Sequence, residues 1–542
     1  MSLTKIFTVA EMIAVEKATD AAGISYNQMM ENAGRGLAET ISDNYPVAGM
    51  KILVLVGPGN NGGDGLVAGR YLAEAGADVA FYLFRQRDPA KDVNFAKIQT
   101  MGLFAVTADF DQRYRVLRTR LAITDLIIDG LLGTGVARPI GGDLAKLMQQ
   151  IHAGINGRRA AFQQPAPRSR ISLTNPDFAS EKSPASLPVI AIDCPSGLNC
   201  DSGALDELAV PADLTITFAG AKRGHFQFPG AAACGELIVA DIGVPPDLAA
   251  QTAVAVEIAT PSTIRALLPQ RPADGHKGTF GTALIAAGSA HYWGAPLLAG
   301  QGAYRAGAGL VALAVPQVIR GNIAGQLPEA TYPPVPDREL LTSASFTFLQ
   351  EQTNAKALLV GPGLDKATDF MQALLDTNKL PPLIIDADGL NQLPPIANWA
   401  QKLPPNTILT PHPGEMSRLM GVSLNDLKAM ERITLAQQQA QTWGHIVLLK
   451  GAYTVIAAPD GRCTVLPFAN PALGVAGSGD VLAGIIVGLL AQGIAPYETA
   501  VLGGYLHGLA GQIAGEWVAG SGLLASEIAA AVPQARQRLL AN

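Results

Sequence analysis

Charged residues, cysteines and long apolar runs are all scarce in this sequence, and each shortage excludes a class of protein. Only 15% of the 542 residues are charged, against about 25% in typical soluble domains. The net charge of −6 gives no general attraction for nucleic acid. The longest apolar run, residues 481–495, falls short of the ~18 residues that cross a bilayer. We therefore expect a buried helix there, and neither a nucleic-acid nor a membrane partner.

The chain has four cysteines without CxxC spacing and seven histidines without an HxxxH pair. Neither pattern supports structural zinc or a disulfide framework. Residues near the N-terminus include Lys5, Glu11 and Lys17, so no apolar core of a signal peptide is present. A reducing cytoplasm is the expected location.

Short apolar runs separated by helix-length segments recur along the whole chain. In the first half they are residues 51–56, 78–84, 125–131, 188–193, 214–220 and 236–244. In the second half they are residues 282–288, 310–316, 357–363, 382–389, 406–415, 446–451 and 453–459. This alternation predicts an α/β protein with two parallel sheets, each covered by helices on both faces.

A stretch without strong periodicity, residues 245–271, separates the two halves. We place the domain boundary inside it, which gives domains at residues 1–247 and 256–542. Residues 154–187, which carry four arginines and several prolines, are long for a loop inside a compact domain. We interpret them as a solvated insertion, with a lid or a partner contact as the alternative.

The string GPGNNGGDG at residues 57–65 follows a predicted strand and contains GxGxxG. Glycines in this setting let a phosphate approach the backbone, and the following helix N-terminus favours an anion. The obvious interpretation is a dinucleotide-dependent oxidoreductase. However, Asp64 would repel phosphates, and Arg85 stands where an acidic residue usually holds the ribose. A tight turn capped by Asp64 is the alternative.

Two further strings in the first half, residues 129–139 and 192–198, also follow strands. If the three strands are adjacent, Asn61, Asp129, Asp193 and Ser196 converge on one edge of the sheet. Oxygen ligands of this kind suit a hard cation, and a partly buried carboxylate there can work as an acid or base. The alternatives are a turn without a ligand for the first string and a helix cap for Asp193.

In the second half, GVAGSGDVLAG at residues 474–484 runs from a glycine loop into the apolar helix. Its free N–H groups and the helix dipole make an anion pocket, and Asp480 could deprotonate a substrate hydroxyl beside a phosphate donor. No GxxxxGK[ST] occurs, so this is not a P-loop NTPase. The alternative for Asp480 is an N-cap aspartate on a core helix. For His412, a lone histidine in the TPHPGE string, the alternative is a structural role.

The ordered set of motifs resembles one family. MMENAG, GNNGGDG, GLLGTG and IDCPSGL in the first half, with HKGTFG, VGPGL, TPHPGE, KGAYT and GSGD in the second, are similar to bifunctional NAD(P)H-hydrate repair enzymes. The resemblance implies a Rossmann-like three-layer α/β/α domain followed by a ribokinase-like α/β domain. It implies that the first domain interconverts the R and S hydrates of NADH and NADPH. The second would phosphorylate the S hydrate with ADP and then eliminate phosphate to restore NAD(P)H.

The same resemblance implies site residues. Substrate in the epimerase domain would contact Asn60, Asn61, Gly62, Gly63, Asp64, Gly133, Thr134, Gly135, Val136, Ala137, Arg138, Pro139 and Asp193. Potassium would be held by Asn61, Asp129 and Ser196, and Asp193 would do the acid–base work with Lys222 as a second participant. The hydrated dinucleotide in the dehydratase domain would contact Ala295, Gly363, His412 and Asp480, the last as base. ADP would contact Lys450, Gly451, Ala452, Tyr453, Thr454 and Gly479. Magnesium is expected with ADP, without assigned ligands, and a homo-oligomer is expected.

Four departures from the family pattern stand out: Cys194 in CPSG, Asp365 in GPGLD, Gly389 in DADGL and the serine of GSGD. None of them removes a proposed acid, base or amide donor, although Asp365 puts the ligand contact after Gly363 in question. Two other functions remain open at this point. One is a ribokinase-like kinase for a vitamin precursor or sugar alcohol with a fused dinucleotide sensor, and the other is a non-catalytic first half.

Overall fold

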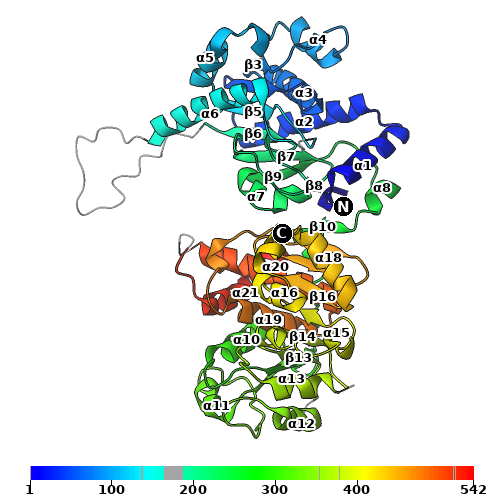
Figure 1. The fold of residues 1–542 in the computed structure, drawn as a ribbon, viewed down its shortest axis with the longest axis vertical. Helices are drawn as coiled ribbons and strands as arrows, with labels where there is room; N and C mark the ends of the chain where they lie inside the picture. Colours follow the sequence, from blue (N-terminus) through cyan, green and yellow to red (C-terminus); the bar gives the residue numbers. More distant parts are fainter. Residues whose placement is uncertain are drawn as a thin grey trace, which may run out of the picture. The chain divides into compact units, whose positions relative to one another are not determined.

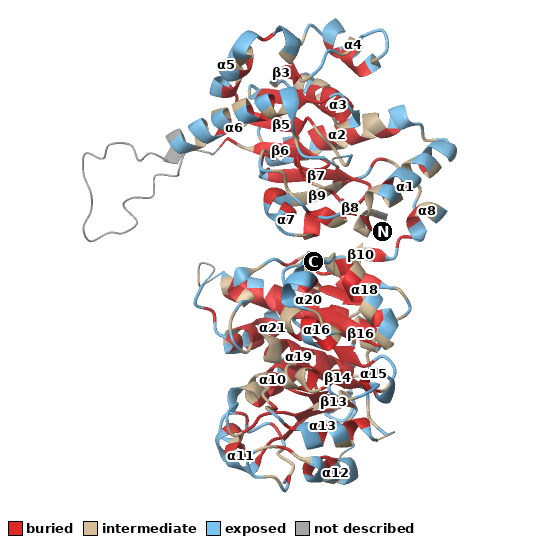
Figure 2. Cartoon of the chain, viewed as in Figure 1, coloured by how far each residue is buried: buried red, intermediate tan, exposed pale blue. Residues whose placement is uncertain are grey.

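The computed structural model describes residues 2–135, 138–163, 187–352, 354–377, 379–516, 518 and 521–541. The chain divides into two compact units, residues 1–254 and 255–542 (Figure 1). The division lies inside the stretch 245–271. Each unit is built around its own sheet, whose central strands are buried (Figure 2).

The first unit contains a seven-stranded parallel sheet in the order β4-β3-β2-β5-β6-β7-β9. Its strands are β2 Lys51–Val56, β3 Asp78–Leu83, β4 Phe104–Thr107, β5 Leu126–Gly130, β6 Val189–Ile192, β7 Leu214–Phe218 and β9 Glu236–Ala240. The first six positions follow the strand order of a Rossmann fold, in which the order reverses between β2 and β5. Ligands of such sheets bind beyond the carboxyl ends of the strands at this point.

Helices cover both faces of this sheet, as the sequence predicts. Alternate residues of β2 point to opposite faces, so Val54 packs with helices α1–α4 and Leu55 packs with α5 and α6. These helices are α1 Val9–Ala21, α2 Tyr26–Asn44, α3 Asn60–Glu74, α4 Val93–Thr100, α5 Arg115–Ile123 and α6 Gly142–Gln163. Short elements complete the unit: β1 Ile6–Phe7 pairs with β8 Ala221–Lys222, and α7 is Gly230–Ala233 and α8 Ala249–Thr252.

The second unit contains a nine-stranded sheet in the order β10-β18-β17-β16-β15-β14-β13-β11-β12. Its strands are β10 Val256–Ile258, β11 Thr282–Ala286, β12 Leu310–Ala314, β13 Ala357–Val360, β14 Leu383–Ile385, β15 Ile408–Leu409, β16 Ile446–Leu449, β17 Val455–Ala457 and β18 Cys463–Val465. The prediction of a wholly parallel sheet is wrong at β17, which is antiparallel to β16 and β18. A connection of five residues between β16 and β17 permits only a hairpin.

Two layers of helices cover the second sheet. One face carries α9 Pro261–Arg265, α10 Gly294–Arg305, α11 Gln317–Ala324, α19 Ser478–Leu490, α20 Pro496–Gly515 and α21 Ala525–Ala541. The other carries α12 Ser343–Gln352, α13 Thr368–Leu375, α14 Asp388–Asn391 and α15 Trp399–Lys402, followed along the chain by α16 Pro413–Met420, α17 Leu424–Ala429 and α18 Arg432–Trp443. Among the described residues, no helix is long and apolar enough to cross a membrane.

The predicted buried helix at the apolar run is α19, which packs closely on α10. A Cβ on Gly484 would lie 2.1 Å from the carbonyl oxygen of Ala299, and one on Gly488 would lie 2.5 Å from that of Ala303. The two backbones therefore meet at distances that only glycine permits. Some of the 58 glycines of the chain thus serve this helix crossing and not ligand loops.

The boundaries of the predicted insertion also need correction. Residues 154–163 are not loop but the last turns of α6, and residues 164–186 lie outside the described part. Arg158 donates hydrogen bonds to the carbonyl groups of Leu121, Ala122 and Thr124 at the end of α5. Arg159 pairs with Asp213 at 2.8 Å. These arginines join neighbouring elements of the unit and are not part of a solvated insertion.

Candidate active sites

The polar residues predicted to converge in the first unit do meet at the carboxyl ends of β2, β5 and β6, which are neighbours in the sheet. Asp129 accepts hydrogen bonds from the amide of Ser196 at 2.9 Å and from its hydroxyl at 2.7 Å. The Asn61 amide group donates to the carbonyl oxygens of Ile192 and Leu132 at 2.7 and 3.0 Å. Burial raises the pKa of Asp129, and the Ser196 hydrogen bonds oppose this.

Asp193 follows β6 and forms a buried ion pair with Lys222. Lys222 is 1% exposed, and its Nζ lies 2.5 Å from Asp193 Oδ1 and 2.8 Å from Thr217 Oγ1. Burial works against ionisation of Asp193, but Lys222 holds the pKa of this carboxyl below its usual value. The backbone at Asp193 has a φ of 62°, an uncommon conformation for a residue other than glycine. The strand end thus places an ionised carboxylate and its cation together in the site.

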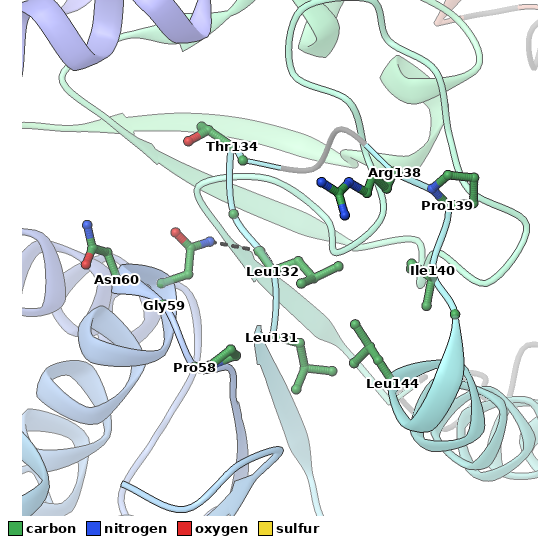
Figure 3. A pocket seen from close by; sticks show the side chains of 14 residues that line it. Pro58, Gly59, Asn60, Leu131, Leu132, Thr134, Arg138, Pro139, Ile140 and Leu144 are labelled. Carbon is green, nitrogen blue, oxygen red and sulfur yellow. Dashed lines mark hydrogen bonds between the residues drawn. The ribbon is translucent and has the colours of Figure 1, made fainter. Parts of the chain in front are cut away.

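A cavity of about 700 Å³ lies in front of these strand ends (Figure 3). Its walls are the start of α3 at Asn60 and Asn61, the loop of Leu132 and Thr134, and the loop of Arg138 that leads into α6. In Figure 3, the Leu132–Thr134 segment runs between Asn60 and Arg138. Of the residues predicted here, Val136 and Ala137 lie outside the described part.

The glycines of the two loops near this cavity fall into two groups. A Cβ on Gly57 would lie 1.8 Å from the carbonyl oxygen of Leu131, and one on Gly62 would lie 2.1 Å from that of Gly57. These two positions require glycine for the packing of the protein itself. Nothing lies within 4 Å of a Cβ on Gly59 or Gly135, so there the absent side chains leave space at the cavity for a ligand.

Asn60 also lines a second cavity of about 220 Å³, together with Asp64, Glu16 of α1 and Phe218 of β7. Asn60 and Asp64 are four residues apart on α3 and therefore share a helix face. Asp64 lies beyond the first turn of α3, whose N-cap is Gly59, and its side chain is buried. The alternative in which Asp64 is a first-turn cap is wrong.

In the second unit, the glycine loop and Asp480 have the predicted geometry. Gly477 has a φ of 85° and is the N-cap of α19, and Asp480 is the third residue of that helix. Asp480 is therefore not the N-cap, because glycine occupies that position. Burial and the nearby Asp386 raise the pKa of Asp480 to about 7, a value suited to a general base at neutral pH.

Lys450 lies beside this loop and is held by two acidic residues. Its Nζ is 2.7 Å from Asp386 Oδ1 and 3.5 Å from Glu415 Oε2, and 3.6 Å from where a Cβ on Gly479 would be. Burial disfavours the ammonium group, but Asp386 and Glu415 raise the pKa of Lys450 above its usual value. A charged lysine is thus fixed next to the loop that leads to Asp480.

His412 has a structural role in the second unit. Its Nδ1 accepts hydrogen bonds from the amides of Gly414 and Glu415, so it caps α16. The neutral ring required for this is favoured because burial lowers the pKa of His412. The side chain is still 49% exposed, which leaves its other edge accessible to a ligand.

Gly363 and Ala295 are neighbours, since a Cβ on Gly363 would lie 3.0 Å from Ala295 Cβ. Asp365, one of the departures from the family pattern, has a φ of 56° and pairs with His291 Nδ1 at 2.8 Å. Its amide donates to Asp388, a carboxylate that also raises the pKa of Asp480. The aspartate therefore adopts a backbone conformation that suits glycine without displacing Gly363.

Residues 450–454, predicted to contact ADP, form the hairpin connection between β16 and β17. Gly451 has a φ of 142° and packs against Arg432, whose guanidinium donates to the carbonyl groups of Leu449 and Lys450. Thr454 Oγ1 donates to the Gly451 carbonyl. These hydrogen bonds fix the conformation of the connection that carries Lys450.

Comparison with known proteins also divides the chain into two parts, which match two different family models. Residues 26–224 match the family model of the YjeF-related protein N-terminus, and residues 283–534 match that of NAD(P)H-hydrate dehydratase. A bifunctional NAD(P)H-hydrate repair enzyme of Moorella thermoacetica is 37% identical over 93% of this chain and 92% of its own length. One from Thermofilum pendens is 34% identical over 99% and 97%. This chain belongs to the family of bifunctional NAD(P)H-hydrate repair enzymes.

Among solved structures, the ADP/ATP-dependent NAD(P)H-hydrate dehydratase of Bacillus subtilis, co-crystallised with ATP and Mg²⁺, is 35% identical. The match covers 53% of this chain and 100% of the chain of that enzyme, with a TM-score of 0.45. Membership of the repair-enzyme family confirms the predicted function in nicotinamide nucleotide repair and the Rossmann-like and ribokinase-like fold classes. It also argues against a kinase for a vitamin precursor.

Sequence reasoning missed several residues of these sites. Arg87 donates to the carbonyl oxygens of Gly57 and Gly59 and fixes the first glycine loop, yet it stands in a segment without a motif. Glu16 lies more than 40 residues before that loop, and nothing in its local sequence indicates the cavity. Asp386 and Glu415 were not missed, because both stand in motifs that follow strands. Only their contact with Lys450 could not be read from the sequence.

Proposed function

We propose that the first unit interconverts the R and S hydrates of NADH and NADPH. The observation that carries this proposal is the buried Asp193–Lys222 pair. Asp193 directly follows Ile192, whose carbonyl oxygen accepts a hydrogen bond from Asn61 in the wall of the glycine-lined cavity. Epimerisation needs acid–base groups at the hydroxyl-bearing carbon but no hydride acceptor. A carboxylate with a lowered pKa beside a lysine can exchange protons with that hydroxyl group.

The cavity lined by Asn60, Asn61, Gly133–Gly135 and Arg138 would hold the phosphates and ribose of the substrate. The first turn of α3 presents free N–H groups there, and Arg138 adds a cation. Gly62, Gly63, Val136, Ala137 and Pro139 would complete the contacts implied by the family resemblance. The hydrated ring would then lie toward Asp64 and Asp193.

Asn61, Asp129 and Ser196 would hold a potassium ion. Their oxygen atoms suit a hard cation, and they already share a connected hydrogen-bond network at the strand ends. Among the described residues, no group of three or more His, Cys, Asp or Glu side chains could hold a metal ion, so neutral oxygens would supply most of the ligands. The ion would fix the loops on which Asn61 and Ser196 stand.

The second unit would dehydrate the S hydrate with ADP as phosphoryl donor. Asp480 takes the proton of the substrate hydroxyl, whose oxygen attacks the terminal phosphorus of ADP as AMP leaves. Phosphate is then eliminated from the ring, which restores the dihydropyridine. The observation that carries this proposal is the position of Asp480 in the first turn of α19 with a pKa of about 7.

In this unit, Gly451, Ala452, Tyr453, Thr454 and Gly479 would contact ADP, and Lys450 would face its phosphates. The amides of the glycine loop would stabilise the charge on the transferring phosphoryl group. Ala295, Gly363 and His412 would contact the hydrated dinucleotide. Magnesium would accompany ADP and neutralise phosphate charge.

A direct test uses the full-length protein with a mixture of R and S NADH hydrate and ADP, followed at the absorbance band of NADH. The Asp193→Asn variant should recover only the S fraction, and Asp480→Asn should recover none. The surface substitutions Glu74→Gln and Asp460→Asn are matched controls and should behave as wild type. Normal recovery of the R fraction by Asp193→Asn contradicts the epimerase assignment, and recovery by Asp480→Asn contradicts the dehydratase assignment.

Two coarser proposals complete the description. The chain has only four cysteines, and all of them are buried. This low cysteine content suits a reducing compartment, and we place the protein in the cytoplasm. We also propose a homo-oligomer, which sedimentation of the purified protein tests directly.

A further inference from the structure

The cavity of about 220 Å³ in the first unit contains more acid groups than the proposed epimerase reaction has so far used. Glu16 and Asp64 line it, and both lie close enough to Asp193 and Lys222 to interact with their charges. Asn60 lines this cavity and the larger one alike. Asn60 therefore forms a wall common to both cavities, and the acid groups of the smaller one lie within electrostatic reach of the Asp193–Lys222 pair.

Asp64 has an unusual environment for an aspartate. It is 7% exposed, and among the described residues none donates a hydrogen bond to its carboxyl group. The other cavity walls combine apolar side chains, among them Met30 and Phe218, with the polar side chains of Asn27, Asn60 and Tyr26. A buried carboxyl without a hydrogen-bond donor is costly when ionised. This points to a ligand group inside the cavity as the partner of the Asp64 carboxyl.

The charges around Asp64 favour its protonated form. The two cations near it are already engaged: Arg87 binds Asp92 and two loop carbonyls, and Lys222 binds Asp193. Glu16 from α1 and Asp193 add negative charge, while His225 is neutral because burial lowers its pKa to about 3. Tyr26 is the remaining titratable group on the cavity wall. Burial, with Asp193 and Glu16, raises the pKa of Asp64 well above its usual value.

We propose that Asp64 is the proton donor of the epimerase reaction and that Glu16 is a positioning residue that keeps Asp64 protonated. This inference rests on the proposed epimerase function. Two carboxyl groups whose environments push their proton affinities in opposite directions divide the acid and base roles between them. Asp64 is the acid, and Asp193, stabilised as a carboxylate by Lys222, is the base.

The step balances without an oxidant or reductant. Asp64 gives its proton to the ring hydroxyl, the carbon–oxygen bond breaks, and the oxygen leaves as water with the bonding electrons. The lone pair of the adjacent ring nitrogen forms a double bond to that carbon. Water then adds to the opposite face, its proton goes to Asp193, and the double-bond electrons return to nitrogen. The reverse reaction uses the two carboxyl groups in exchanged roles. Before the next R hydrate reacts, Asp193 gives its proton to solvent water and Asp64 takes one up, which restores the starting state.

The test measures the conversion of R to S hydrate by the full-length protein with excess ADP. In this assay the S fraction reacts first and reports the second unit, and the R fraction follows as it is epimerised. For Asp64→Asn we expect a 10²- to 10⁴-fold lower kcat for the R phase, an unchanged KM and an unchanged S phase. Glu16→Gln should keep activity at low pH but lose it at a lower pH than wild type, because Asp64 then gives up its proton more readily. Asp20→Asn, on the exposed side of the same helix α1, is the matched control.

Thermal unfolding of each variant checks that the first unit is folded. A wild-type R phase in Asp64→Asn overturns the proposal, as does a raised KM with unchanged kcat, which would make Asp64 a binding residue. A pH profile of Glu16→Gln identical to that of wild type overturns the role of Glu16. If the wild-type protein itself fails to convert the R hydrate, the epimerase function is what fails.

Discussion

Replacing Lys222 with methionine should destabilise the first unit strongly, because the change leaves a buried carboxylate without its cation. Lys222 is 1% exposed, and its Nζ contacts Asp193 Oδ1, Thr217 Oγ1 and the carbonyl oxygens of Phe218 and Gly220 at 2.5, 2.8, 3.2 and 3.2 Å. Methionine fills similar space but offers no donor. Removal of one partner of a buried ion pair costs about 3–5 kcal/mol, and we expect a loss of this size in the free energy of unfolding at pH 8.

The loss should depend on pH, and its sign follows from Asp193. In the wild-type protein the pKa of Asp193 is lowered, chiefly by Lys222 acting against burial. This contribution to stability is present above the unfolded pKa of about 3.9 and is lost as the pH falls through the folded value. Without Lys222, burial raises the pKa of Asp193 instead. Relative to wild type, the variant is then most stable at a pH where Asp193 is protonated. The difference in unfolding free energy between wild type and Lys222→Met should therefore grow from pH 5 to pH 8.

Guanidinium unfolding followed by two signals separates the units. All four tryptophans, Trp293, Trp399, Trp443 and Trp517, belong to the second half of the chain, so their fluorescence should be unchanged in Lys222→Met. Circular dichroism reports both units and should show the earlier transition of the first. Lys17→Met, on the exposed surface of α1, is the control. An unfolding free energy within about 0.5 kcal/mol of wild type, or a deficit larger at pH 5 than at pH 8, would refute the role assigned to the pair.

Three further predictions concern the loops and the second site. The dehydratase rate should rise with pH through about 7 as Asp480 loses its proton, and the rise should be absent in Asp480→Asn; a wild-type rate that is flat between pH 6 and 8 contradicts this. Gly57→Ala should destabilise the first unit by several kcal/mol because its Cβ would lie 1.8 Å from a carbonyl oxygen, whereas Gly59→Ala, with nothing within 4 Å, should not; equal unfolding midpoints would show that the loop adapts. His412→Ala should lower the stability of the second unit by about 0.5–2 kcal/mol through loss of the helix cap, measured by tryptophan fluorescence, and His412→Asn should restore most of it.

Much of the architecture could be predicted from the sequence because buried parallel strands are nearly continuous apolar runs. Residues 51–56 and 78–84 were recognisable for this reason. Three strands of the two large sheets were not recognised, namely β4, β10 and β18. Each is a run of only three or four residues that includes a polar side chain, so no continuous apolar run marks it. The antiparallel β17 was visible as a run, but its direction depended on the length of the connection before it.

The candidate sites were predictable where chemistry follows a strand end directly. Asp129, Asp193 and Ser196 meet because the strands before them are neighbours in the sheet. Lys222 could be suggested from its place after β7, but its pairing with Asp193 required the fold. Glu16 and Arg87 could not be found, because helix α1 and the loop after β3 reach the site only through tertiary packing.

The two activities are tested together by one measurement on the purified full-length protein. It is incubated with a mixture of R and S NADH hydrate plus ADP, and the absorbance of NADH is followed to completion. We predict complete recovery in two phases, a first phase from the S hydrate and a second from the R hydrate, with AMP and phosphate formed in equal amounts. Recovery that stops at the S fraction would contradict the epimerase assignment, and no recovery with ADP would contradict the dehydratase assignment.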